Sequence, residues 1–171
     1  SDLPFRENVE RTRAVVELAR PVGVSVEAEL GRVAGGEGTL APNEADYVFT
    51  DPDEAVRFVD ATGIDALAVS IGTAHGVYRS TPRLDLGLLR KLASAVRIPL
   101  VLHGCSGLPE DQIKKVIQLG IEKVNIFTDL SLAAENAMRY LLSSRSEPIG
   151  YPTILACSRA VVKRTVARYL E

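Results

Sequence analysis

The sequence predicts an α/β fold in which four strand–helix units build a parallel sheet, half of a (β/α)₈ barrel. Strand-like apolar runs alternate four times with helix-like patterns along the 171 residues. No turn sequence typical of a hairpin lies between them. Successive strands must then be joined by helical crossovers, which makes the sheet parallel. An apolar content of 46% supports a sizeable core in a single domain.

The predicted helices are recognised by apolar residues three and four positions apart and by their end signals. In the first helix Asn8 is the predicted N-cap, and Pro21 ends the helix after about Arg20. Residues 51–52, an Asp-Pro pair, start the next helix, and Gly63 closes it. Further helices are predicted at 86–96, 110–120, 128–141 and 156–169, with a polar connector at 143–152.

The predicted strands are 22–30, 66–71, 100–102 and 123–126. In the first strand a valine-rich face alternates with a face that carries Glu27 and Glu29. In a small parallel barrel this second face points inward, so we expect both carboxylates to be buried or at a site. The stretch 31–50 contains glycines and has no clear periodicity. Loops of this length in compact domains are often lids or binding loops.

Charge and composition exclude several classes of protein. The net charge of −2 gives no electrostatic case for nucleic acid, and aromatic residues at 5% without tryptophan offer no platform for stacking bases. No apolar run approaches the ~18 residues of a membrane span, and the first residues lack the pattern of a signal peptide. Two cysteines are too few for a disulfide scaffold, so we expect reduced thiols in a cytoplasmic protein.

Both histidines of the sequence stand at the carboxyl end of a predicted strand and directly before a glycine. His75 follows the strand 66–71, and His103 follows the strand 100–102. Functional residues of a βα barrel gather at these strand ends, so two imidazoles from neighbouring strands suit a divalent metal such as Zn²⁺. The alternative is that each is an ordinary packed histidine. A catalytic zinc usually has three protein ligands, so the third must be a carboxylate here or a residue outside this chain.

Two loops at neighbouring strand ends predict a phosphate site. Residues 104–107, Gly-Cys-Ser-Gly, offer backbone N–H groups and a hydroxyl to an anion, and residues 125–128 supply a second set. The alternatives are a plain tight turn for the first loop and a simple N-cap role for Thr128 in the second.

Five segments, in the same order, resemble class II, metal-dependent ketose-bisphosphate aldolases, most closely the fructose- and tagatose-bisphosphate branch. They are Val26–Gly31, Asp65–Val69, Gly72–Tyr78, Leu100–Gly104 and Lys123–Ile126. The resemblance implies a TIM barrel of which residues 1–171 form the C-terminal half, about strands 5–8.

The resemblance also implies roles for individual residues. His75 and His103 match two of the family's three zinc-ligating histidines, and Glu29 matches a carboxylate near the metal in some members. Glu37 falls on the mobile loop whose acidic residue is thought to help move the proton. The positions that match those holding the substrate's phosphate and ketone end are Gly76, Gly104, Ser106, Asn125 and Thr128. Asn125 is expected to act in catalysis as well, by hydrogen bonding to the reacting oxygens.

The implied activity is zinc-dependent, reversible aldol cleavage of a ketose 1,6-bisphosphate to dihydroxyacetone phosphate and an aldehyde, as in glycolysis. The implied cofactor is Zn²⁺, to which we add a monovalent cation, and the implied partners are the phosphorylated ketose and further copies of the chain in a homo-oligomer. The alternative function is a non-catalytic half-barrel that binds a phosphorylated ligand and assembles with another chain.

Three departures from the family pattern are visible. The His-x-Asp-His segment, which supplies another zinc histidine and the catalytic aspartate, is absent from the sequence. Gly38 follows Glu37 where aspartate is common, and Phe127 stands where relatives often have a small residue or aspartate beside the phosphate. We therefore expect the isolated chain to be incomplete as an enzyme.

Overall fold

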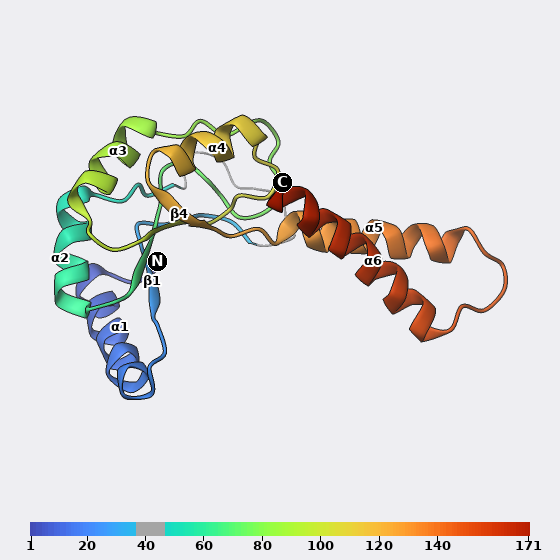
Figure 1. The fold of residues 1–171 in the computed structure, drawn as a ribbon, viewed down its shortest axis with the longest axis horizontal. Helices are drawn as coiled ribbons and strands as arrows, with labels where there is room; N and C mark the ends of the chain where they lie inside the picture. The colour runs from blue at the N-terminus through green and yellow to red at the C-terminus, as the bar shows by residue number, and fades with distance from the viewer. Residues whose placement is uncertain (37–46) are drawn as a thin grey trace. The chain divides into compact units, whose positions relative to one another are not determined.

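The computed structural model describes residues 1–36 and 47–171 of the chain. These residues form two compact units, Ser1–Asn125 and Ile126–Glu171. The larger unit contains the sheet with its covering helices, and the smaller unit consists of two helices (Figure 1).

The sheet of the larger unit is parallel and has the strand order β1-β2-β3-β4, so strands consecutive in the sequence are also neighbours in space. Its strands are β1 (Glu27–Leu30), β2 (Ala66–Val69), β3 (Leu100–Leu102) and β4 (Ile121–Val124). The helices are α1 (Phe5–Ala19), η1 (a 3₁₀ helix, Arg20–Val22), α2 (Pro52–Thr62), α3 (Leu86–Ala95) and α4 (Glu110–Gln118). This arrangement confirms the predicted α/β fold with a parallel sheet.

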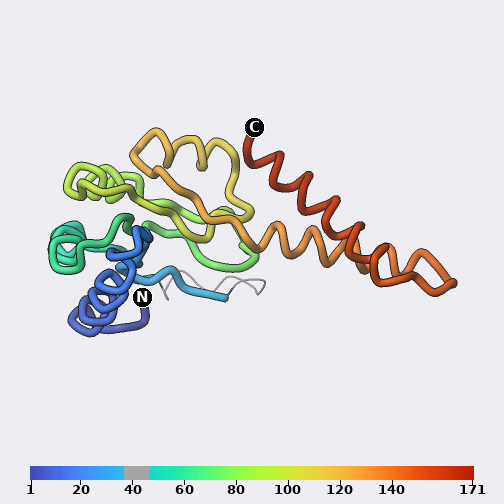
Figure 2. The backbone as a smooth tube through the Cα atoms, turned by 60° about the horizontal axis from the view of Figure 1, so that its bottom comes forward, coloured from blue at the N-terminus to red at the C-terminus, as the bar shows by residue number. Residues whose placement is uncertain are grey.

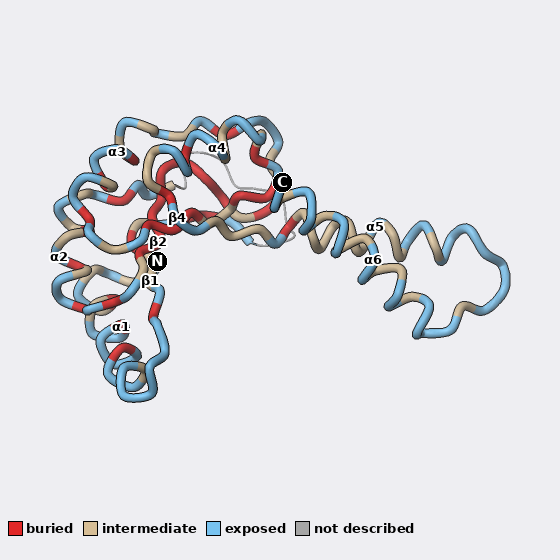
Figure 3. The backbone as a smooth tube through the Cα atoms, viewed as in Figure 1, coloured by how far each residue is buried: buried red, intermediate tan, exposed pale blue. Residues whose placement is uncertain are grey.

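The core of this unit lies between the strands and the helices, where Figure 3 shows the buried parts of the chain. Leu67 of β2 and Val101 of β3 have no exposed surface, and neither have Phe58 of α2 and Leu89 and Leu92 of α3. Burying one such leucine or phenylalanine side chain contributes about 1.5–3 kcal/mol relative to leaving it in water. The packing holds the strands in place and so fixes the positions of their carboxyl ends.

Helix α2 shows how local sequence sets the element bounds. The Asp51 carboxylate accepts hydrogen bonds from the backbone N–H groups of Asp53 at 3.0 Å and Glu54 at 2.9 Å. Gly63 ends the helix in a left-handed conformation with φ of +67°, which glycine adopts without steric cost. The predicted helix at these residues is confirmed.

The first helix and the first strand differ from their predicted bounds. Helix α1 begins at Phe5, so Asn8 lies inside the helix and the N-cap prediction for it is wrong. Its buried side chain instead donates to the carbonyl oxygen of Glu29 at 3.0 Å. Residues 22–30 form a strand only from Glu27 onward, because Pro21 lies in η1 and Gly23 turns the chain with φ of +69°.

The last strand spans Ile121–Val124, so it begins and ends two residues earlier than predicted, and its register to β3 contains an irregularity. Leu100 pairs with Ile121, but Val101 pairs with Lys123, so one residue of β4 is skipped. Side chains alternate between the two faces of a strand, so this shift places Lys123 rather than Glu122 on the face that Val101 occupies.

The smaller unit is a pair of helices in contact with each other, α5 (Thr128–Ser143) and α6 (Tyr151–Leu170), which Figure 2 shows diverging from their connecting loop. Helix α6 begins earlier than the predicted residue 156, because Pro152 fits in the first turn of a helix. The Tyr169 hydroxyl donates to the Asp129 carboxylate, and Arg168 lies 3.8 Å from the same group. None of the described helices has the length and apolar character needed to cross a membrane.

Candidate active site

The two histidines lie in the loops that directly follow β2 and β3. The backbone N–H of His75 donates to the carbonyl oxygen of Ala34 at 2.9 Å, which ties the loop after β2 to the segment after β1. The His75 and His103 rings have their centroids 5.9 Å apart and their planes inclined by 45°. The structure therefore brings together the two histidines that the sequence places at neighbouring strand ends.

This approach depends on a glycine directly after His103. Gly104 has φ of +69°, and a Cβ atom at this position would lie 2.4 Å from the carbonyl oxygen of Ala74. Any side chain here would push the loop of His103 away from the loop of His75. Gly76, on the other side of His75, is buried and also has a positive φ, of +103°.

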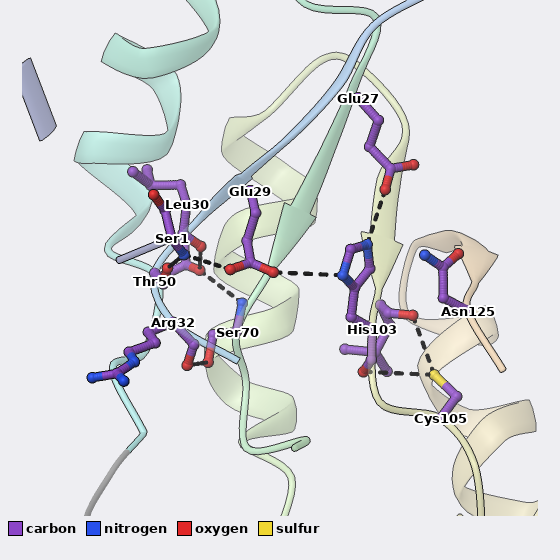
Figure 4. Close-up of polar contacts among 12 residues, drawn as sticks. Ser1, Glu27, Glu29, Leu30, Arg32, Thr50, Ser70, His103, Cys105 and Asn125 are labelled. Atoms are coloured by element: carbon purple, nitrogen blue, oxygen red, sulfur yellow. Dashed lines mark hydrogen bonds and ion pairs between the residues drawn. The ribbon is translucent and has the colours of Figure 1, made fainter. Parts of the chain in front are cut away.

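Two carboxylates of β1 point at the imidazole of His103 (Figure 4). Its Nε2 atom lies 2.9 Å from Oε1 of Glu27, and its Nδ1 atom lies 3.5 Å from Oε2 of Glu29. All three side chains are half-buried, with exposed fractions of 20% for His103, 27% for Glu27 and 22% for Glu29. Glu27 and Glu29, the first and third residues of β1, thus lie on one face of the strand and both face His103.

Lys123 of β4 completes this group of charges. Its Nζ atom donates to Oε2 of Glu27 and to Oδ1 of Asn125, each at 2.8 Å. Partial burial acts to raise the pKa of Glu27, but the hydrogen bonds and positive charges of Lys123 and His103 outweigh it. The pKa of Glu27 therefore lies below its ordinary value of 4.5, and the carboxylate is ionised near neutral pH.

Asn125 follows β4 and holds the neighbouring loop in place. Its backbone N–H donates to Leu102 at 2.9 Å, and its carbonyl oxygen accepts from the N–H of Cys105 at 3.1 Å. Oδ1 of Asn125 accepts from Lys123, so the donor of this side chain is its amide N–H₂ group. A bond from Asn125 to substrate oxygens would use that group.

The loop 104–107 contains one buried hydroxyl and one buried thiol. Ser106 is 5% exposed, and Cys105 is fully buried. Burial raises the pKa of Cys105 to about 12, against the opposing effect of a backbone hydrogen bond with Asn125. The thiol is therefore neutral near pH 7 and is not a nucleophile, and the polar groups of the loop are its backbone N–H groups and the Ser106 hydroxyl.

The donor types here fit zinc, although they are not gathered into a complete site. Two imidazoles and the Glu29 carboxylate are the kinds of ligand that zinc takes. Within residues 1–36 and 47–171, no group of three or more His, Cys, Asp or Glu side chains is close enough to hold a metal ion. Both ring nitrogens of His103 face carboxylates, so metal binding there would replace one of these contacts.

Two other predicted site residues do not belong to the described part of the larger unit. Glu37 falls outside the described residues. Thr128 is buried and belongs to the smaller unit, where it is the first residue of α5 rather than its N-cap. Sequence reasoning did not assign roles to Lys123 and Tyr78, although both lie in segments that carry the family resemblance.

The chain matches a known protein family over its whole length. Residues 1–171 match the family described as Fructose-bisphosphate aldolase class-II. The chain belongs to the class II fructose-bisphosphate aldolase family. This confirms the resemblance found in the sequence.

Solved aldolase structures share the fold. The YdjI aldolase from Escherichia coli K12 is 38% identical with a TM-score of 0.81, and the match covers 99% of this chain and 57% of that one. A putative fructose-1,6-biphosphate aldolase from Coccidioides immitis is 30% identical with a TM-score of 0.76, over 96% and 58%. Fructose-bisphosphate aldolase from Campylobacter jejuni, 23% identical with a TM-score of 0.70, shows the fold alone, over 99% and 56%. The class II aldolase chain described here thus spans less than two thirds of these relatives and corresponds to part of their barrel.

Proposed function

We propose that this chain carries two zinc ligands and the phosphate-binding loops of an enzyme that cleaves a ketose 1,6-bisphosphate to dihydroxyacetone phosphate and an aldehyde. The observation that supports this most directly is the pair of imidazoles, His75 and His103, whose centroids lie 5.9 Å apart at neighbouring strand ends. Glu29 beside His103 is the third candidate ligand from this chain. A bound zinc would act as a Lewis acid that stabilises negative charge on the substrate's ketone oxygen.

The remaining residues bind and orient the substrate. Backbone N–H groups of Gly76, Gly104 and the Ser106 region, with the Ser106 hydroxyl, hold the phosphate, and the fixed phosphate keeps the reacting carbon in place. The Asn125 amide donates to the reacting oxygens, where negative charge develops. We assign Thr128 to the phosphate and Glu37 to proton transfer, both by family position.

Residues beyond this chain complete the site in our proposal. The chain spans 57% of the YdjI aldolase, so a third histidine ligand and a catalytic aspartate would come from the remaining part of the barrel. We further propose a cytoplasmic homo-oligomer that uses Zn²⁺ and a monovalent cation, on the basis of family membership.

Metal binding by histidine variants tests the zinc site. We expect the chain to bind Zn²⁺ with an affinity well below that of a complete three-ligand site, and to lose binding in His75→Ala and in His103→Ala. Isothermal titration and metal analysis after dialysis measure this, with Arg13→Ala on the exposed side of α1 as a control. Unchanged zinc content in both histidine variants would rule the site out.

A second candidate function is a non-catalytic half-barrel that binds a phosphorylated ligand. It is favoured by the lack of a gathered three-ligand metal group in the described residues. The two functions differ in a simple measurement. A phosphate-binding partner would bind dihydroxyacetone phosphate without zinc and would gain no aldolase activity when the rest of the barrel is supplied.

A further inference from the structure

Tyr78 lies at the junction of the two loops that carry the histidines. Its hydroxyl oxygen accepts a hydrogen bond from the backbone N–H of Ala74 at 2.8 Å and donates one to the carbonyl oxygen of Gly104, also at 2.8 Å. Ala74 directly precedes His75, and Gly104 directly follows His103. One hydroxyl group therefore links the backbone next to His75 with the backbone next to His103.

The surroundings keep this link in place. Burial raises the pKa of Tyr78 above its ordinary value of 10, so the phenol is protonated near neutral pH and can donate to Gly104. The backbone of Gly104 also lies directly against Ala74, where a Cβ atom would meet the Ala74 carbonyl oxygen at 2.4 Å. The two loops thus touch, and the phenol bridges them at the point of contact.

We propose that the Tyr78 hydroxyl is a positioning group that sets the spacing of the His75 and His103 imidazoles by hydrogen bonding to both of their loops. Without the hydroxyl, the N–H of Ala74 and the carbonyl of Gly104 would lose this partner in a partly buried setting, and the loops would have to move apart or admit water. The expected effect of Tyr78 on metal binding rests on the proposed function, whereas its effect on the spacing of the two imidazoles does not.

Tyr78→Phe tests the spacing in the metal-free chain, because it removes only the hydroxyl and keeps the ring. Tyr140→Phe is the matched control, since the Tyr140 side chain on α5 is 75% exposed. We expect the imidazole NMR resonances of both histidines to shift in Tyr78→Phe and to stay unchanged in the control. Amide hydrogen exchange at Ala74 should become faster by about 10-fold or more in Tyr78→Phe.

Cobalt binding tests the consequence for the metal, because Co²⁺ reports its ligand geometry in its visible spectrum. We expect Tyr78→Phe to weaken Co²⁺ binding by about 10-fold and to change the spectrum, as loss of groups that orient metal ligands does. Tyr140→Phe should match the unsubstituted chain in both measurements.

The outcomes distinguish the positioning role of Tyr78 from the proposed zinc site. If the unsubstituted chain binds no Co²⁺, the proposed zinc site fails, and the imidazole resonances alone decide the role of Tyr78. If Tyr78→Phe lowers only the melting temperature while imidazole resonances and Co²⁺ binding keep their original values, the hydroxyl is merely structural and the inference is overturned. Should the variant fail to fold, fast exchange of the Ala74 amide in the unsubstituted chain would overturn it as well, and slow exchange would support it.

Discussion

The Nε2 atom of His103 lies 2.9 Å from Oε1 of Glu27. This contact makes His103, a candidate metal ligand, part of a row of charged side chains across the sheet, which we call the charge chain: His103, Glu27 and Lys123. The other oxygen of Glu27 accepts from Lys123 at 2.8 Å. A carboxylate that bonds to one ring nitrogen of a histidine fixes the orientation of the ring and raises its basicity as a ligand. Glu27 can do this for His103, and Lys123 holds Glu27 in the required position.

Replacing this carboxylate should weaken metal binding without removing a ligand. We expect Glu27→Gln to reduce the Zn²⁺ affinity of the chain by about 10-fold or more, since the amide keeps the shape but loses the charge that supports His103. Isothermal titration measures the effect. Glu17→Gln is the matched control, because Glu17 is 70% exposed on α1. Equal affinities for the two variants would show that Glu27 does not support the histidine.

The lowered pKa of Glu27 predicts how stability depends on pH. In the unfolded chain the group titrates near 4.5, whereas in the folded protein its pKa is lower, because Lys123 and His103 favour the ionised form over the opposing effect of burial. The contribution to stability is therefore present above about pH 4.5 and is lost as the pH falls through the folded-state pKa.

Urea unfolding from about pH 6 to about pH 3.5 checks this sign. The difference in unfolding free energy between the unsubstituted chain and Glu27→Gln should be constant above about pH 5 and should shrink below it. A difference that grows as the pH falls would contradict the assigned direction of the shift.

The register between β3 and β4 explains why this charge chain was hard to predict. Alternation within 22–30 was enough to place Glu27 and Glu29 on one face, because side chains in a strand alternate strictly. Lys123 lies 96 positions after Glu27, so alternation within one strand could not place it beside this carboxylate. Without the irregularity beside Leu100, Val101 would pair with Glu122, which would bring a third carboxylate to that face. No local signal in the sequence marks this irregularity.

Other features were predictable for equally specific reasons. The positions of the two histidines followed from apolar runs and glycines that mark where strands end, and the fold followed from the repeated strand–helix order. The Tyr78 bridge could not be predicted, because it depends on a backbone contact between Ala74 and Gly104. Such contacts are set by how the strands pack and not by residue type.

The open sheet predicts that the isolated chain assembles. In the described part of the chain β1 and β4 form the two edges of the sheet, and edge strands present backbone groups that can pair with another copy. Several apolar side chains in and after α1 are also exposed, including Leu18 at 78% and Val22 at 73%. We expect sedimentation at micromolar concentration to show a dimer or a larger species, and a compact monomer that unfolds cooperatively would contradict this.

Leu18→Glu provides a sharper form of the assembly test. A charge at this exposed position should shift the equilibrium toward the monomer if the apolar surface takes part, whereas Arg13→Glu, at a 58% exposed position on the same helix, should not. The two variants are compared at equal concentration and ionic strength, because charge alone alters association.

Activity separates the incomplete site from a complete one. We predict no useful cleavage of fructose or tagatose 1,6-bisphosphate by the 171-residue chain, even with added Zn²⁺. Acid–base catalysis typically contributes ~10²–10⁴-fold, and the metal's stabilisation of charge is worth several kcal/mol more. Without a third ligand and the family's aspartate, Glu37 alone cannot supply both effects.

Supplying the remaining part of the barrel should restore turnover, measured by coupling release of dihydroxyacetone phosphate to a reporter dehydrogenase. In the restored enzyme Ser106→Ala should raise KM more than it lowers kcat, because the hydroxyl serves the phosphate, which is bound in both the ground state and the transition state. Ser94→Ala, whose hydroxyl donates within α3 to Arg90, is the matched control. Robust turnover by the 171-residue chain alone would instead point to an unrecognised base and ligand, and Glu29 and Glu37 would be the first residues to replace.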